Sequence, residues 1–244
     1  MAAYGNMDKG LPGELVGLTN THQIDSRLAK GAVPFGGLCF GTGDGEQVTA
    51  KGDGALLGVA ARTALDTPEY KDGDTVNVCR TGKIFGTAGE AVSADAEVSV
   101  NGSTGKIIAK TSAANGAKRT VTITLSGTSA ASKVVTVVVG DKVAQVNTTN
   151  DVKAAADVAA ALKTAIDALD IPFVATVSSA VVTLTAKDKG AAANDIAVTG
   201  STTDSTQTVT VANGTSGSDV VLNPGWFARS TAEAANDLVI VDLG

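Results

Sequence analysis

The feature that most constrains the fold of this chain is a change in sequence character near residues 117 and 217. Outside these two points the chain has many glycine-rich turns, as in 32–37 and 70–76. Between them lies a stretch rich in Thr, Val and Ala that contains one clear amphipathic helix. This change predicts a small domain inserted into a loop of another domain. Because inserts are tolerated at exposed loop tips, we expect this one to be displayed outward.

The change in character also sets the expected domain boundaries. We expect an extended N-terminal arm at residues 1–30 and a discontinuous β-rich domain at 31–117 and 217–244. The inserted α+β domain should occupy residues 118–216. The predicted fold class is mainly β, a barrel or sandwich carrying an insert with one helix on a small sheet.

Composition narrows the classes of partner. Only 3% of the residues are aromatic, so the cores must be built from Val, Ile, Leu and Ala. The formal charge of −6 argues against nucleic acid or an anionic membrane as main partner, because both require clustered Lys and Arg. The N-terminus lacks the apolar core of a secretory signal, and no apolar run approaches the length of a membrane span. We therefore expect a soluble protein made in a cytoplasm.

The first 30 residues carry several glycines and no sustained hydrophobic period. Segments of this kind are disordered or held against a neighbouring subunit. The candidate contact residues of this arm are Leu11, Pro12, Leu15 and His22.

In the outer domain, apolar runs alternate with turn signals roughly every eight to twelve residues, which is typical of a sandwich or barrel. We expect residues 75–80 and 83–87 to form a hairpin around Thr81 and Gly82. Residues 96–100 should form a strand followed by a second strand at 106–109. The apolar run 238–241 predicts a strand buried on both faces, which needs partners from the N-terminal part.

The middle segment alternates in several places, and its helix is predicted from about Asp151 to Leu169. Thr148 and Asp151 resemble a capping box, and Pro172 limits the helix at its other end. The helix should place its apolar stripe on one face of a small sheet. That stripe consists of Val152, Ala155, Ala159, Leu162, Ile166 and Leu169.

Residues for catalysis are nearly absent, so we expect no enzyme and no catalytic, cofactor or metal site. His22 is the only histidine, and one histidine with two distant cysteines does not make a zinc site. Cys39 and Cys79 are expected to be reduced, although spacing does not exclude a disulfide between them. Residues 41–45, 52–54 and 72–74 are expected to be Gly/Asp turns rather than phosphate or calcium sites.

Trp226 and Phe227 form the most prominent aromatic pair. The pair could close the end of the β-domain, or it could anchor a subunit or capsid contact, where Trp is often a hot spot. The sequence leaves both alternatives open.

The order of several motifs resembles the structural cement proteins of tailed-phage heads. These motifs are Ala32–Gly37, Leu57–Ala60, Tyr70–Val78, Gly82–Ile84, Ala91–Ala94 and Ala232–Val241. The resemblance covers about 1–115 and 218–244. The insert is similar to a small domain found on phage tail-sheath and other virion proteins, through its helix and the segments 171–176, 182–187 and 190–196.

This resemblance implies a β-rich decoration protein on the outer capsid surface of the virion, made in the bacterial host cytoplasm. Its implied partners are the major capsid protein and further copies of itself, as a homodimer or homotrimer. Removing residues 1–30 should then weaken capsid attachment while the β-domain still folds.

Two other functions remain open at this point. The insert could bind a carbohydrate or host receptor, although Phe173 is its only aromatic residue for stacking on a sugar. Alternatively, the chain could be a component of a tail sheath or tube.

Overall fold

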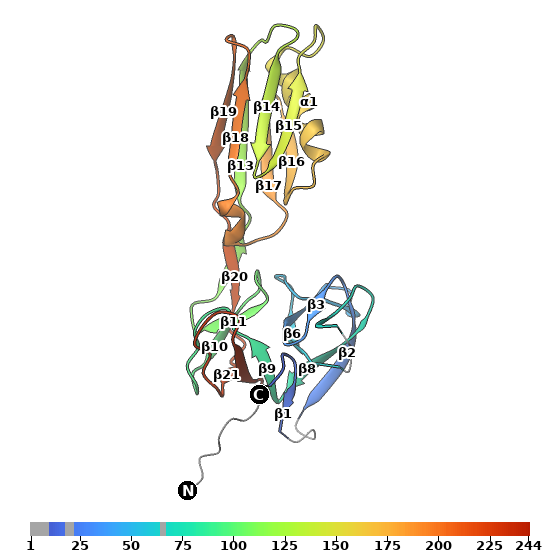
Figure 1. Cartoon of the computed structure of the whole chain (residues 1–244), viewed down its shortest axis with the longest axis vertical. Coiled ribbons are helices and arrows are strands. Elements are labelled where there is room, and N and C mark those ends of the chain that lie inside the picture. Colours follow the sequence, from blue (N-terminus) through green and yellow to red (C-terminus); the bar gives the residue numbers. More distant parts are fainter. Residues whose placement is uncertain (1–9, 18–21, 64–66) are drawn as a thin grey trace. The chain divides into compact units, whose positions relative to one another are not determined.

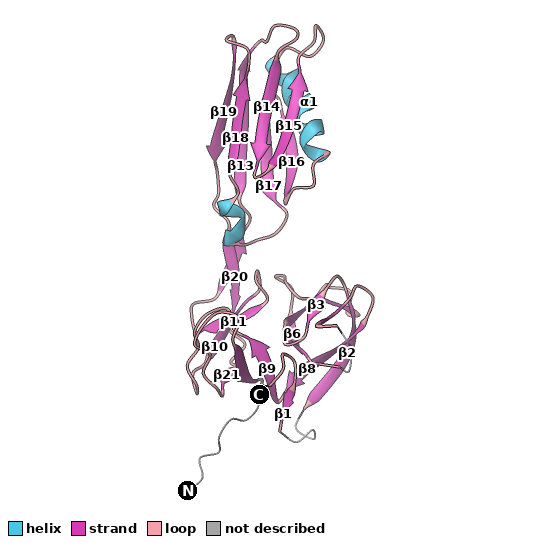
Figure 2. Ribbon diagram, viewed as in Figure 1, coloured by secondary structure: helices cyan, strands magenta, loops and turns pink. Residues whose placement is uncertain are grey.

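The computed structural model describes residues 10–17, 22–63 and 67–244, and contacts between residues divide the chain into two compact units. Unit 1 comprises Met1–Asn115 and Asp219–Gly244, and unit 2 comprises Gly116–Ser218. Both units consist mainly of strands, which confirms the predicted fold class (Figure 2). That the two units are independently folding domains stays a prediction.

Unit 1 contains a closed five-stranded barrel in the order β2-β5-β4-β6-β8 (Figure 1). A short antiparallel pair, β3 with β7, accompanies the barrel. The bounds are β2 (Gln23–Ala29), β3 (Val33–Pro34), β4 (Leu38–Gly41), β5 (Gln47–Thr49), β6 (Leu56–Ala60), β7 (Glu69–Tyr70) and β8 (Thr75–Thr81).

The other described strands of unit 1 form two four-stranded sheets, in the orders β1-β9-β22-β21 and β11-β10-β20-β12. As predicted, the C-terminal strand pairs with an N-terminal one, because β22 lies antiparallel to β9. Only alternate residues of β22 are fully buried, so its expected burial on both faces is incomplete. The bounds are β1 (Leu15–Val16), β9 (Lys83–Thr87), β10 (Val98–Asn101), β11 (Lys106–Ala109), β12 (Ala114–Ala117), β20 (Ser218–Leu222), β21 (Phe227–Ala228) and β22 (Leu238–Asp242).

The hairpin predicted between β8 and β9 is wrong. β8 pairs with β2 and β6 in the barrel, whereas β9 pairs with β1 and β22 in a different sheet. Gly82, with φ of +98°, lies between the two strands and permits the change of direction that carries the chain from one sheet to the other.

Several barrel strands are buried on both faces. Leu38 and Phe40 of β4 belong to one hydrophobic cluster, while Cys39 between them belongs to another. The first cluster also contains residues of β9, β10, β11 and β22, and the second contains Val76 and Val78 of β8. An uninterrupted apolar run such as 38–40 is therefore required here, because successive side chains alternate between two cores.

The described part of the N-terminal segment differs from the expected extended arm. β2 pairs with β8 from Gln23 to Leu28 and closes the barrel. Its last residue, Ala29, lies in the barrel core. The missing hydrophobic period did not prevent this pairing, because main-chain hydrogen bonds hold a strand whose side chains are mostly exposed. Residues 1–9 and 18–21 of the predicted arm lie outside the described residues.

Unit 2 consists of two sheets, where the sequence predicted one. The strand orders are β16-β17-β13-β19 and β15-β14-β18, and the inward side chains of both sheets form one core with the helix. The bounds are β13 (Thr120–Gly127), β14 (Val134–Val139), β15 (Lys142–Asn147), β16 (Phe173–Ser178), β17 (Val181–Ala186), β18 (Val198–Thr202) and β19 (Gln207–Asn213), with a 3₁₀ helix, η2 (Ala191–Asp195).

The helix α1 (Ala155–Asp167) begins later than predicted and packs along β15 and β16 (Figure 2). The expected capping box is absent, because the hydroxyl of Thr148 donates to the carbonyl of Ala130 at 2.6 Å. Ala154 instead forms a β-bridge with Thr128, so the chain is extended immediately before the helix. The predicted stripe is largely confirmed, since Ala159, Leu162 and Ile166 are buried together with Val158.

Candidate functional site

The three contact residues predicted in the first part of the arm have unequal exposure. Leu11 is 50% exposed, and its amide donates to the carboxylate of Glu14 at 2.9 Å. Pro12 is half-buried. Leu15 is also half-buried, pairs with Ile84 in β9 and packs against the core of unit 1. Of these three, Leu11 is the side chain most available to a partner.

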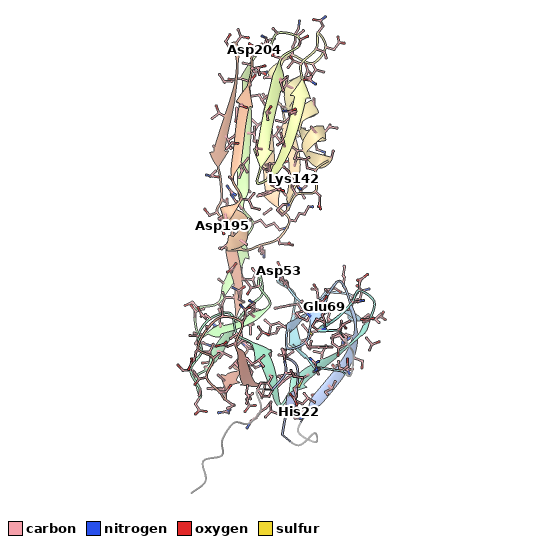
Figure 3. All side chains as sticks on the ribbon, in the orientation of Figure 1. His22, Asp53, Glu69, Lys142, Asp195 and Asp204 are labelled. Atoms are coloured by element: carbon pink, nitrogen blue, oxygen red, sulfur yellow. The ribbon has the colours of Figure 1, made fainter. Side chains whose placement is uncertain are left out.

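His22 is held by the body of unit 1 (Figure 3). Its Nε2 lies 2.9 Å from the main-chain carbonyl of Lys83, which fixes the proton on that nitrogen. Its Nδ1 is buried without a hydrogen-bond partner among the described residues. His22 therefore holds the chain before β2 against β9 and is itself half-buried.

Trp226 and Phe227 differ in exposure to solvent. Trp226 is 6% exposed and belongs to the core of unit 1, so it closes that core and is not available as a contact anchor. Phe227 is 41% exposed, and the guanidinium of Arg229 lies 5.7 Å from its ring centroid. Trp226 therefore fits the first alternative, in which it closes the end of the β-domain. A role in a subunit or capsid contact fits the exposed side chain of Phe227.

An exposed apolar stripe on β2 was not among the predicted contacts. Ile24 and Leu28 are both 43% exposed, and Ser26 between them is also exposed. On the side away from β8, the strand β5 reaches only Leu28 and Ala29 among the described residues. We call Ile24, Ser26 and Leu28 the β2 stripe. Its i, i+2, i+4 spacing is visible in the sequence, but the glycines around it favour the prediction of an irregular arm.

The sheets of unit 2 expose surfaces without charge. Among the strand residues of this unit, only Lys142 is charged, and it lies at the start of β15 (Figure 3). Threonines face each other on neighbouring strands, as in the pairs Thr122 with Thr183 and Thr124 with Thr210. Unit 2 contains eight basic and eight acidic residues, so the formal charge of −6 belongs entirely to unit 1. Phe173 is buried and offers no stacking platform for a sugar.

Asp204 connects two loops at one end of unit 2 (Figure 3). Its carboxylate accepts hydrogen bonds from the hydroxyl and amide of Thr206, both at 2.7 Å, and from the amide of Ala130 at 2.6 Å. The hydroxyl of Ser129 donates to it at 3.0 Å. These hydrogen bonds, those of Thr206 first, hold the pKa of Asp204 far below its usual range although burial opposes the shift.

We predict that Asp204→Asn lowers the thermal stability of unit 2 at neutral pH. Because the folded-state pKa is depressed, the carboxylate stabilises the fold above its unfolded pKa of about 3.9, and this contribution is lost as the pH falls below that value. Between pH 7 and pH 2, the melting temperature of the wild type should therefore fall by more than that of the variant. Equal pH slopes for the two proteins would contradict the assignment.

The remaining polar motifs are structural. In the 41–45 loop, the Asp44 carboxylate accepts the amides of Gln47 and Glu46 at 2.9 and 3.0 Å, which lowers its pKa. Asp74 accepts the amide of Lys71 at 2.7 Å, and Asp72 accepts that of Gly31 at 2.7 Å. These carboxylates stabilise turns by accepting main-chain amides. Within the described part of the chain, no three His, Cys, Asp or Glu side chains are grouped so that they could hold a metal ion.

The two cysteines are buried free thiols. Burial raises the pKa of Cys39 to about 12 and that of Cys79 to about 11. Both thiols are therefore protonated at neutral pH and unsuited to nucleophilic chemistry. Separately, none of the described helices is both long and apolar enough to cross a bilayer.

Comparison with known proteins adds one match. A family model described as "Structural cement protein (E217 gp24/Pam3 gp6)" matches residues 2–244, and its bounds enclose both units. No curated protein matches the chain.

Proposed function

Since the chain belongs to the phage structural cement proteins, it is a structural virion protein that stabilises the capsid, and we propose that it does so by bridging neighbouring major capsid subunits. It binds the outer capsid surface as a homodimer or homotrimer, with unit 2 displayed outward. Bridging of a repeating lattice requires contact area at several points rather than a reactive site, and multiple contacts add avidity.

The observation that carries this proposal is the β2 stripe. Two large apolar side chains, Ile24 and Leu28, stand exposed on a strand whose outer edge is largely unpaired among the described residues. An exposed strand edge binds an extended segment of a partner through main-chain hydrogen bonds, and adjacent apolar side chains add buried area. In contrast, the neutral strand faces of unit 2 supply no charge for attachment.

We predict that Ile24→Thr/Leu28→Thr weakens capsid binding about 10- to 100-fold, because two apolar contacts are lost while strand propensity is kept. The measurement is co-sedimentation with undecorated capsids of the source phage, alongside light scattering of the free protein. The matched control is Val143→Thr/Val174→Thr, which changes two exposed apolar strand residues of unit 2. This control should bind as the wild type does.

Three outcomes would contradict the proposal. Absence of saturable wild-type binding, with rings or tubes formed instead, would favour a tail component. Loss of binding only in the unit 2 control would reverse the assigned roles of the units. Equal binding by all three proteins would remove the β2 stripe from the contact.

A further inference from the structure

Three segments of unit 1 that are distant in sequence line an open cavity of about 280 Å³. Lys30 and Gly31 follow β2, Thr49 and Lys51 lie at the end of β5, and the turn of the β10–β11 hairpin supplies Thr104 and Gly105. None of its lining residues is acidic. We call this the lysine cavity.

The walls of the lysine cavity are held by main-chain contacts. The amide of Lys30 donates to the carbonyl of Val48 at 2.8 Å, and that of Gly52 donates to Gly102 at 3.0 Å. A Cβ at Gly105 would lie 2.6 Å from the carbonyl oxygen of Ala50, so the hairpin turn packs directly on the end of β5. The cavity is therefore formed before any ligand arrives, which reduces the entropy lost on binding.

The two lysines differ from the cations of unit 1 that form ion pairs. Arg80, Lys110 and Arg229 each form an ion pair with an aspartate or glutamate of the same unit. Within the described part of the chain, neither Lys30 nor Lys51 lies within 4.0 Å of a carboxylate. Lys30 acts on the carboxylate of Asp44 only at longer range. Two lysines and two threonines thus line one cavity in a unit that carries all of the chain's net negative charge.

We propose that the lysine cavity binds a carboxylate side chain on an acidic segment of the major capsid protein. This inference deepens the proposed function, because it names the chemistry of the partner. Ammonium and hydroxyl donors suit a carboxylate, and such charge-assisted hydrogen bonds are the stronger kind. The volume of about 280 Å³ is ample for one side chain and lies at the lower end of the range of about 300–1,000 Å³ found for small-molecule pockets.

The test compares Lys30→Gln/Lys51→Gln with Lys71→Gln/Lys83→Gln, a control pair of exposed lysines in unit 1 with the same charge change. Co-sedimentation with undecorated capsids should show about tenfold weaker binding for the first variant and a change below about twofold for the control. The first variant should also lose less affinity when the salt concentration is raised. Melting curves verify that both variants fold, as expected for exposed side chains.

A zero-length carbodiimide cross-link provides a direct readout, because it joins a lysine amine only to a carboxylate in contact with it. Mass spectrometry of decorated capsids should find Lys30 or Lys51 joined to an Asp or Glu of the capsid protein. Cross-links only to further copies of this chain, or none from either lysine, would overturn the inference. So would a DNA oligonucleotide that binds the wild type but not Lys30→Gln/Lys51→Gln.

The two proposals fail in distinguishable ways. If the wild type does not bind capsids, the proposed function fails. If the wild type binds and both lysine variants bind equally well, only the lysine cavity is excluded.

Discussion

Deletion of residues 1–30 is expected to abolish the cooperative folding of unit 1. The deletion removes β2, which closes the barrel between β5 and β8. It leaves the pairing edge of β8 without a partner from Thr75 to Thr81 and opens the core around Val76 and Val78. The loss of a full strand and its hydrogen bonds is comparable to the whole stability of a domain, about 5–15 kcal/mol.

This expectation replaces the one drawn from the sequence, in which the same deletion weakened attachment to the capsid but left the fold intact. The measurement is near-ultraviolet circular dichroism with thermal melting of the full chain and the truncated chain. A matched control deletes only residues 1–9 and retains every described strand. A cooperative transition of unit 1 at the wild-type temperature after removal of residues 1–30 would show that β2 is dispensable.

Leu162→Ala is expected to destabilise unit 2 by about 3–5 kcal/mol and to leave unit 1 unchanged. Leu162 is fully buried on α1 in the core shared by both sheets of unit 2. Truncation of a buried leucine loses transfer free energy and leaves a cavity that a closely packed core fills only in part. For a unit of this size, such a loss lowers the melting temperature by more than about 10 °C.

The reciprocal control is Leu38→Ala, the same chemical change at a fully buried position of unit 1. Calorimetry of the full chain should show two transitions, each shifted by only one of the two variants, because the core clusters share no residue. This result would establish unit 2 as a separate domain, which stays a prediction here. A single transition shifted equally by both variants would mean that the two units fold as one.

The predictions that succeeded rest on local periodicity. The stripe of α1 follows the helical period, and strands such as Val134–Val139 alternate between half-buried and buried positions. The hairpin of Val98–Asn101 with Lys106–Ala109 was also visible, because its two strands are close in sequence. The resemblance to cement proteins is confirmed by the family match. The similarity of the insert to a tail-sheath domain stays a prediction.

The predictions that failed concern pairing between distant segments. Nothing in residues 75–87 shows that β8 and β9 enter different sheets, because that choice depends on partners at the two ends of the chain, β2 and β22. The sequence likewise did not show that Trp226 is buried while Phe227 beside it is exposed, because burial is decided by the sheets around them.

The sequence by itself therefore determined the mainly β class and the helix, both of which follow from residue types and short spacings. The tertiary structure alone decided that residues 23–29 complete a barrel, that Trp226 is covered while Phe227 is not, and that Lys30 and Lys51 border one cavity. These features depend on which strands meet across long stretches of chain. A strand's own side-chain period fixes its faces but not its neighbours.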